Sequence, residues 1–174
     1  MLQFHSIDNL QEGTPVQQYA YTILVANKIM DILAPFAPIL AGTIPLNIHI
    51  EGSDLDILCC FKNADEFAGS IQATFSKHEN YDLRKKEIAG NPTIIANFFV
   101  NGFEIEIFGQ VVPVTQQNGY RHMIAEHNIL QEKGEAFRRE VIRLKRSGMK
   151  TEPAFAKLLD LKGDPYVSLL EYDV

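Results

Sequence analysis

The spacing of apolar and polar positions predicts an α+β fold, beginning with a helix and a short strand. Apolar residues recur at helical spacing over residues 15–34, and Pro35 ends this pattern because proline breaks helical hydrogen bonding. Residues 38–41 then form a short apolar stretch closed by Gly42, which predicts a buried strand. The segment 43–52 contains Gly, Pro and Asn and is expected to be a loop.

The next segments predict a central strand, a helix and an exposed strand. Residues 54–61 alternate between acidic and apolar side chains before becoming wholly apolar, which is typical of a central strand. Asn63 or Asp65 is expected to cap a helix that extends to about residue 78. Residues 81–88 are mostly polar and predict a strand at an edge of the sheet.

A β-hairpin is the clearest local signal in the sequence. Residues 93–100 are rich in β-branched and aromatic side chains, and Asn101-Gly102 is the dipeptide favoured in a type I′ turn. Residues 103–108 then alternate apolar and acidic positions, as a strand with one buried face does.

The remainder of the chain predicts helices. We expect them over about 115–133, 135–147, 153–161 and 165–172, with Gly134 and Gly148 ending the first two. The fold class is therefore α+β: a mixed, partly antiparallel sheet flanked by helices, with a helical C-terminal third. We expect a single domain over residues 1–174, with the helical extension beginning at about residue 115.

Candidate chemistry begins with Asp54 and Asp56. Residues two apart on a strand share a face and lie about 6.6 Å apart along the chain, so both carboxylates can lean onto one cation. Like charges this close are costly without a cation, and Leu55 and Ile57 anchor the opposite face in the core. Gly42 at a strand end allows close approach of backbone amides to a phosphate, and the Thr43 hydroxyl can donate to the same phosphate.

Two further carboxylates lie on the second arm of the hairpin. Glu104 and Glu106 share one strand face, while apolar neighbours take the other. The two glutamates could face a bound cation, and Glu106 lies deeper in the strand than Glu104. The alternative is that both are solvent-facing charges, which such alternation also produces.

These motifs resemble the signature of the nucleotidyltransferase (polymerase-β-like) superfamily. Gly42-Thr43, a loop of about ten residues and Ser53-Asp54-Leu55-Asp56 are similar to its Gly-Ser pair followed by Asp-apolar-Asp on the next strand. The stretches 105–110, 120–123 and 150–156 resemble an uncharacterised bacterial family, domain of unknown function 4269. This second resemblance covers about residues 41–172.

The resemblance implies a magnesium- or manganese-dependent transfer of a nucleoside monophosphate from a nucleoside triphosphate such as ATP. The superfamily usually has a third carboxylate on a later strand, and Glu106 is favoured for it because it lies deeper in the strand, with Glu104 as the second choice. Asp54, Asp56 and Glu106 would hold the metal, and Gly42, Thr43 and Ser53 would contact the nucleotide. Arg121 could meet a triphosphate. His122 and Glu126 could form a functional pair or only a local pair on a helix surface. The acceptor, whether small molecule, protein or RNA, is not specified by the sequence.

Two alternatives rest on the same fold. Ile44-Pro45 stands where minimal nucleotidyltransferases often have a basic residue, which favours a non-catalytic, regulatory module that binds metal or nucleotide. The other is an interaction protein of toxin–antitoxin type, an arrangement in which minimal nucleotidyltransferases often occur.

Composition and charge narrow the class of protein further. The chain has 174 residues, 46% of them hydrophobic, and a net charge of -6, which argues against broad DNA binding. Neither an apolar run long enough for a membrane span nor a signal peptide is evident, so we expect a cytoplasmic protein. Cys59 and Cys60 are adjacent and are expected to be reduced. Seven basic residues between positions 133 and 150 could form a solvated helix face or a cationic wall for phosphates or RNA.

Overall fold

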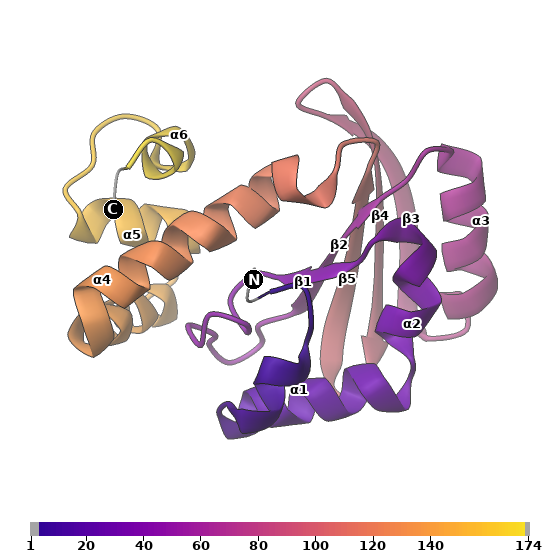
Figure 1. The fold of residues 1–174 in the computed structure, drawn as a ribbon, viewed down its shortest axis with the longest axis horizontal. Coiled ribbons are helices and arrows are strands. Elements are labelled where there is room, and N and C mark those ends of the chain that lie inside the picture. Colours follow the sequence, from indigo (N-terminus) through magenta and orange to yellow (C-terminus); the bar gives the residue numbers. More distant parts are fainter. Residues whose placement is uncertain (1–3, 173–174) are drawn as a thin grey trace.

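A five-stranded mixed sheet separates two groups of helices in the computed structural model, which describes residues 4–172 (Figure 1). The strand order is β1-β2-β5-β4-β3. Strands β2 and β5 are parallel, and the other neighbours are antiparallel. The strands span β1 (Ile39–Ala41), β2 (Leu55–Cys60), β3 (Glu79–Ile88), β4 (Asn91–Val100) and β5 (Phe103–Gln110). The predicted mixed, partly antiparallel sheet is confirmed.

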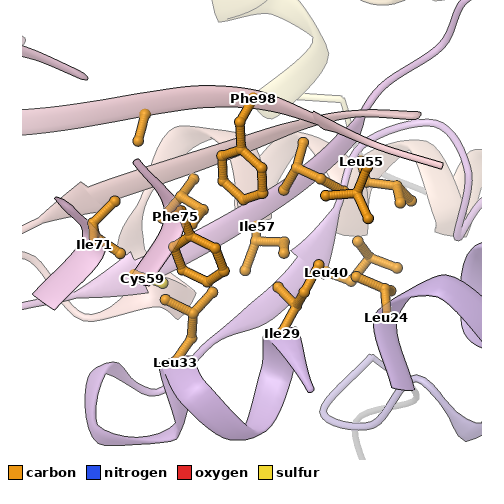
Figure 2. Close-up of a cluster of buried hydrophobic side chains, with 14 of the residues drawn as sticks. Leu24, Ile29, Leu33, Leu40, Leu55, Ile57, Cys59, Ile71, Phe75 and Phe98 are labelled. Carbon is orange, nitrogen blue, oxygen red and sulfur yellow. The ribbon is translucent and has the colours of Figure 1, made fainter. Parts of the chain in front are cut away.

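One face of the sheet is covered by α1 (Pro15–Ala26), α2 (Ile29–Leu33) and α3 (Ala64–Phe75). Short 3-10 turns at Asp8–Glu12 and Ala34–Phe36 flank α1 and α2. Figure 2 shows how their side chains meet those of the strands in a hydrophobic core, with Phe75 stacked on Phe98. This core includes Leu55, Ile57 and Cys59 from β2.

The prediction of one continuous helix over residues 15–34 is wrong. Lys28 takes a left-handed backbone conformation (φ 53°), and the Asn27 side chain donates to the carbonyl of Ile23 at 2.9 Å. Asn27 thus ends α1 with its own amide, as asparagine does near helix ends. The break re-aims the chain so that Ile29 and Leu33 of α2 are fully buried.

The other face of the sheet meets the helical C-terminal third. It comprises a 3-10 turn (Val114–Gln116), α4 (Asn118–Arg146), α5 (Thr151–Leu158) and α6 (Pro165–Leu170). Gly134 is non-helical within α4 (φ 73°), so the helix turns back there, as Figure 1 shows at its lower left. The two halves of α4, together with α5 and α6, share a second hydrophobic core with Ile39, Ala41 and Leu58 of the sheet. The predicted break at Gly134 is confirmed.

Other local predictions are confirmed as well. Asn63 caps α3 by accepting hydrogen bonds from the backbone amides of Asp65 and Glu66. Asn101 and Gly102 both have positive φ (49° and 88°), and Val100 pairs with Phe103 across them, as a type I′ hairpin requires. Strand β3 forms the exposed edge of the sheet.

Two further observations concern the chain as a whole. Both cysteines are free, Cys59 being buried and Cys60 partly exposed. Within residues 4–172, the helices are all too short or too polar to cross a membrane.

Candidate functional site

A cavity of about 550 Å³ lies between the sheet and the helical third. The sheet side contributes Gly42, Thr43, Asp54, Asp56 and Glu106 to its lining. The helix side contributes polar residues from α4 and from the start of α5: His122, Glu126, Lys145, Lys150, Thr151 and Glu152. The cavity therefore has an acidic wall on the strands and a mixed wall on the helices.

The acidic wall follows from the register of the strands. Asp56 on β2 is paired directly with Glu106 on β5 and, on its other side, with Ala41 at the end of β1. Because side chains alternate along a strand, Leu55 and Ile57 point into the first core while Asp56 points toward α4. Asp54 precedes β2 by one residue and lines the same cavity.

Gly42 allows β1 to end directly against the Asp56 carboxylate. A Cβ at position 42 would lie 2.1 Å from Oδ2 of Asp56, and the φ of Gly42 is +78°. The backbone conformation therefore favours glycine here, and a side chain at this position would displace the Asp56 carboxylate. The close approach brings the Gly42-Thr43 backbone beside the carboxylates.

The electrostatics of the acidic wall oppose the charged form of Asp56. Burial, and then the neighbouring charges of Asp54 and Glu106, raise the pKa of Asp56 to about 8. A carboxylate whose charged form is opposed by burial and by like charges is stabilised by a nearby cation.

The helix wall carries buried ionisable side chains, among them Glu126 and Lys145. Burial and the charge of Glu152 raise the pKa of Glu126 well above its ordinary value, and Lys145 opposes this shift. Burial lowers the pKa of Lys145 to about 8, against the opposing influence of Glu126, Glu152, Asp54 and Asp56. Lys145 and Glu126 face the same cavity without forming a direct ion pair within residues 4–172.

The basic second half of α4 holds the loop that connects Thr43 to Asp54. Lys145 Nζ donates to the carbonyl of Ile48 at 2.8 Å, and Arg138 donates to the carbonyl of Leu46. Arg146 forms a 2.9 Å ion pair with Glu51. The basic helix is thus neither only a solvated face nor only a cationic wall, because three of its side chains bind the loop between the two sequence motifs.

Three of the predicted site residues lie outside the cavity lining. Ser53 lies in the loop, where its hydroxyl accepts a hydrogen bond from the Ile50 amide at 3.0 Å and lies 3.4 Å from the Thr43 hydroxyl. Arg121 is exposed and lines a different hollow on the opposite face of α4. Glu104 accepts a hydrogen bond from Asn97 but does not line the cavity. The structure therefore brings together Gly42, Thr43, Asp54, Asp56 and Glu106.

Sequence reasoning did not single out Lys145, Lys150, Thr151 or Glu152 as site residues. One signal was available for Lys145, which follows Leu144 and lies four residues after Val141, both on the buried stripe of α4. Lys150-Thr151-Glu152 follows Gly148 in a short turn and begins α5, and no local pattern places it beside β2.

The acidic wall fits a hard divalent cation by its chemistry. Within residues 4–172, no three His, Cys, Asp or Glu side chains are already gathered in ligand geometry. Nevertheless, the carboxylates of Asp54, Asp56 and Glu106 line the sheet side of the cavity, and the charges of Asp54 and Glu106 raise the pKa of Asp56. Carboxylate oxygens beside open space for water and phosphate are the donor set that magnesium accepts.

Comparison with solved structures identifies the class of fold. The Cid1 poly(U) polymerase with bound MgGTP matches with a TM-score of 0.52 and 14% identity, over 74% of this chain and 41% of that one. The polymerase core of TRAMP, an RNA surveillance complex, matches with a TM-score of 0.51 and 12% identity, over 88% of this chain and 47% of that one. The chain spans less than half the length of these structures. Its fold is that of the polymerase-β-like nucleotidyltransferases.

The family follows from a second comparison. The model of the domain of unknown function DUF4269 matches residues 22–172, so the chain belongs to this family. No curated protein matches it in sequence.

Proposed function

We propose that this protein is a nucleotidyltransferase that depends on a divalent cation, Mg²⁺ or Mn²⁺, and transfers a nucleoside monophosphate from a nucleoside triphosphate to an acceptor. The observation that carries the proposal is the pairing of Asp56 with Glu106 across β2 and β5, beside Gly42 and Asp54 in one cavity. The fold of Cid1, solved with MgGTP bound, supports the class of reaction.

Two parts of the cavity lining suit a metal-bound triphosphate. Asp54, Asp56 and Glu106 would hold the metal on the strand side. Lys145 and Lys150 face the same space from the helix side, where they can neutralise phosphate oxygens. A metal bound there would stabilise the charge that develops as pyrophosphate leaves the α-phosphate.

Several other residues of the cavity have a place in the proposed transfer. The Thr43 hydroxyl donates to a phosphate oxygen, and Gly42 lets the phosphate approach the backbone. Glu106 accepts the proton of the acceptor as its oxygen or nitrogen attacks the α-phosphorus and the bond to the β-phosphate breaks. Glu126 and Glu152 line the rest of the cavity, beside the base or the acceptor.

The alternative hypothesis of a non-catalytic module rested on the absence of a basic residue directly after Thr43. Ile44 is 1% exposed there, and its carbonyl accepts a hydrogen bond from the Gln17 side chain at 2.8 Å, so this position anchors the loop. Lys145 and Lys150 supply positive charge to the cavity from another segment. Their position removes the observation on which this alternative rested, and the transfer assay below separates binding from catalysis.

Isothermal titration tests the proposal. Titration of Mg²⁺ with ATP, GTP, CTP or UTP into the wild-type protein should give binding of at least one nucleotide. Asp54→Asn should abolish this binding, whereas Asp31→Asn, an exposed change on α2, should leave it intact. Transfer of a labelled nucleotide to an acceptor should disappear in Asp56→Asn. The absence of binding to all four nucleotides, or equal binding by Asp54→Asn, would overturn the proposal.

A further inference from the structure

Asn97 on β4 extends the polar row of the sheet beyond the carboxylates. It pairs directly with Glu106 on β5 and with Asp82 on β3. Its side-chain Nδ2 donates to Oε2 of Glu106 at 3.2 Å and to Oε1 of Glu104 at 3.0 Å. Both glutamates of β5 are therefore held by the same amide, which lies outside the cavity lining.

Arg84 on the edge strand fixes which way this amide faces. Its guanidinium donates to Oδ1 of Asn97, and its Nε lies 2.9 Å from Asp82. Because a guanidinium has only donors, it selects the carbonyl oxygen of Asn97 and turns the NH₂ group toward the glutamates. A flipped amide would present its oxygen to two carboxylates and its NH₂ to a cation, and both contacts would be repulsive.

We propose that Asn97 is a positioning residue of the metal site and that Arg84 orients its side-chain amide. Asn97 holds one oxygen of the Glu106 carboxylate, so that the other oxygen faces the cavity. This inference rests on the proposed function, since it takes Glu106 as a metal ligand. It assigns Asn97 no contact with metal or substrate. Residues that orient ligands in this way typically change metal affinity about 10- to 100-fold when removed.

The test measures Mn²⁺ affinity by titration followed by electron paramagnetic resonance of free Mn²⁺, without nucleotide. Asn97→Leu keeps the approximate volume and removes both hydrogen bonds, so it should weaken Mn²⁺ binding about 10-fold. Arg84→Met leaves the amide unoriented and should weaken binding by a smaller factor. Asn91→Ala, at the start of the same strand, removes an amide that donates to the carbonyl of Ala89, and this variant should bind Mn²⁺ as the wild type does.

The outcomes separate the inference from the proposed function. If the wild-type protein binds no Mn²⁺, the metal site itself is wrong. If the wild type binds Mn²⁺ and Asn97→Leu binds it equally well, the positioning role is overturned while the metal site stands. If Asn97→Leu fails to fold, Arg84→Met on the exposed edge strand decides, and unchanged affinity there overturns the inference. A thermal midpoint near that of the wild type, together with weaker Mn²⁺ binding, distinguishes positioning from loss of structure.

Discussion

At the scale of single residues, Asp56 occupies a position that suits the proposed metal site but destabilises the fold when its carboxylate is charged. Burial and the charges of Asp54 and Glu106 raise its folded-state pKa to about 8, above the value of 3.8 expected when unfolded. The protonated Asp56 carboxyl therefore stabilises the fold fully below about pH 4, and this stabilisation is lost as the pH rises through 8. Conflicts of this kind between stability and local chemistry are frequent at functional sites.

We therefore expect Asp56→Asn to raise the thermal midpoint of the metal-free protein, and to raise it more at pH 8 than at pH 5. The amide cannot ionise, so the variant avoids the penalty that grows with pH in the wild type. Thermal unfolding in the presence of a chelator, at both pH values, measures the effect. The exposed change Asp31→Asn serves as the control, and an equal shift at pH 5 and pH 8 for Asp56→Asn would contradict the explanation.

The residues of the site differ in how far they could be predicted. Asp54 could be placed on one face with Asp56, and Glu104 with Glu106, because alternation along a strand is a local rule, whereas the pairing of Asp56 with Glu106 depends on β2 and β5 being neighbours. Arg121 could not be placed, since adjacent helix positions differ by about 100° in direction, and its neighbour His122 faces the cavity instead. Glu126 could be paired with His122 by spacing, but its burial depends on packing that no local pattern reveals.

At the scale of elements, the second half of α4 acts as a clamp on the loop between β1 and β2. Arg138, Lys145 and Arg146 each bind this loop, at Leu46, Ile48 and Glu51 respectively. The sequence predicted this helix and its charge, but its partners lie some ninety residues earlier. Only the turn at Gly134 brings them together.

Arg138→Ala should release the loop. A hydrogen bond from a charged group contributes about 1.5–3 kcal/mol, so amides in the segment 44–53 should exchange faster with solvent, while those of the β4–β5 hairpin stay unchanged. Hydrogen exchange followed by mass spectrometry resolves the two segments. The adjacent Arg139 is exposed, and Arg139→Ala is the matched control. If hydrogen exchange changed by the same amount in the loop and in the hairpin, and did so in both variants, the clamp would be contradicted.

At the scale of the whole molecule, the sheet separates two hydrophobic cores that serve different purposes. The core shared with α1, α2 and α3 is apolar and supports the strands. The core shared with α4, α5 and α6 gives way to the polar cavity, so a ligand there would contact both the sheet and the helical third. The class of fold could be predicted from local patterns, whereas this two-sided arrangement depends on how the helices return across the sheet.

Ligand binding between two layers should stabilise the whole chain. With Mg²⁺ and a non-hydrolysable triphosphate at 100 times its Kd, linkage adds about 2.7 kcal/mol to the free energy of unfolding. For a chain of this length, that raises the thermal midpoint by about 5–10 °C. Differential scanning calorimetry measures the shift. The double variant Asp54→Asn/Asp56→Asn should show none, and a shift of equal size in that variant would place binding elsewhere.

The turn at Gly134 also has a genetic consequence. Every strand carboxylate and Glu126 are encoded before this codon, whereas Lys145, Lys150 and Glu152 are encoded after it. A stop codon or frameshift between Gly134 and Arg138 would leave the reading frame of all five strands intact and delete Lys145 and Lys150, which bring positive charge to the cavity. The encoded protein would keep the acidic wall of the sheet but lose the loop clamp and the cavity lysines. We therefore expect such truncations to be as damaging as changes in the Asp-Leu-Asp motif itself.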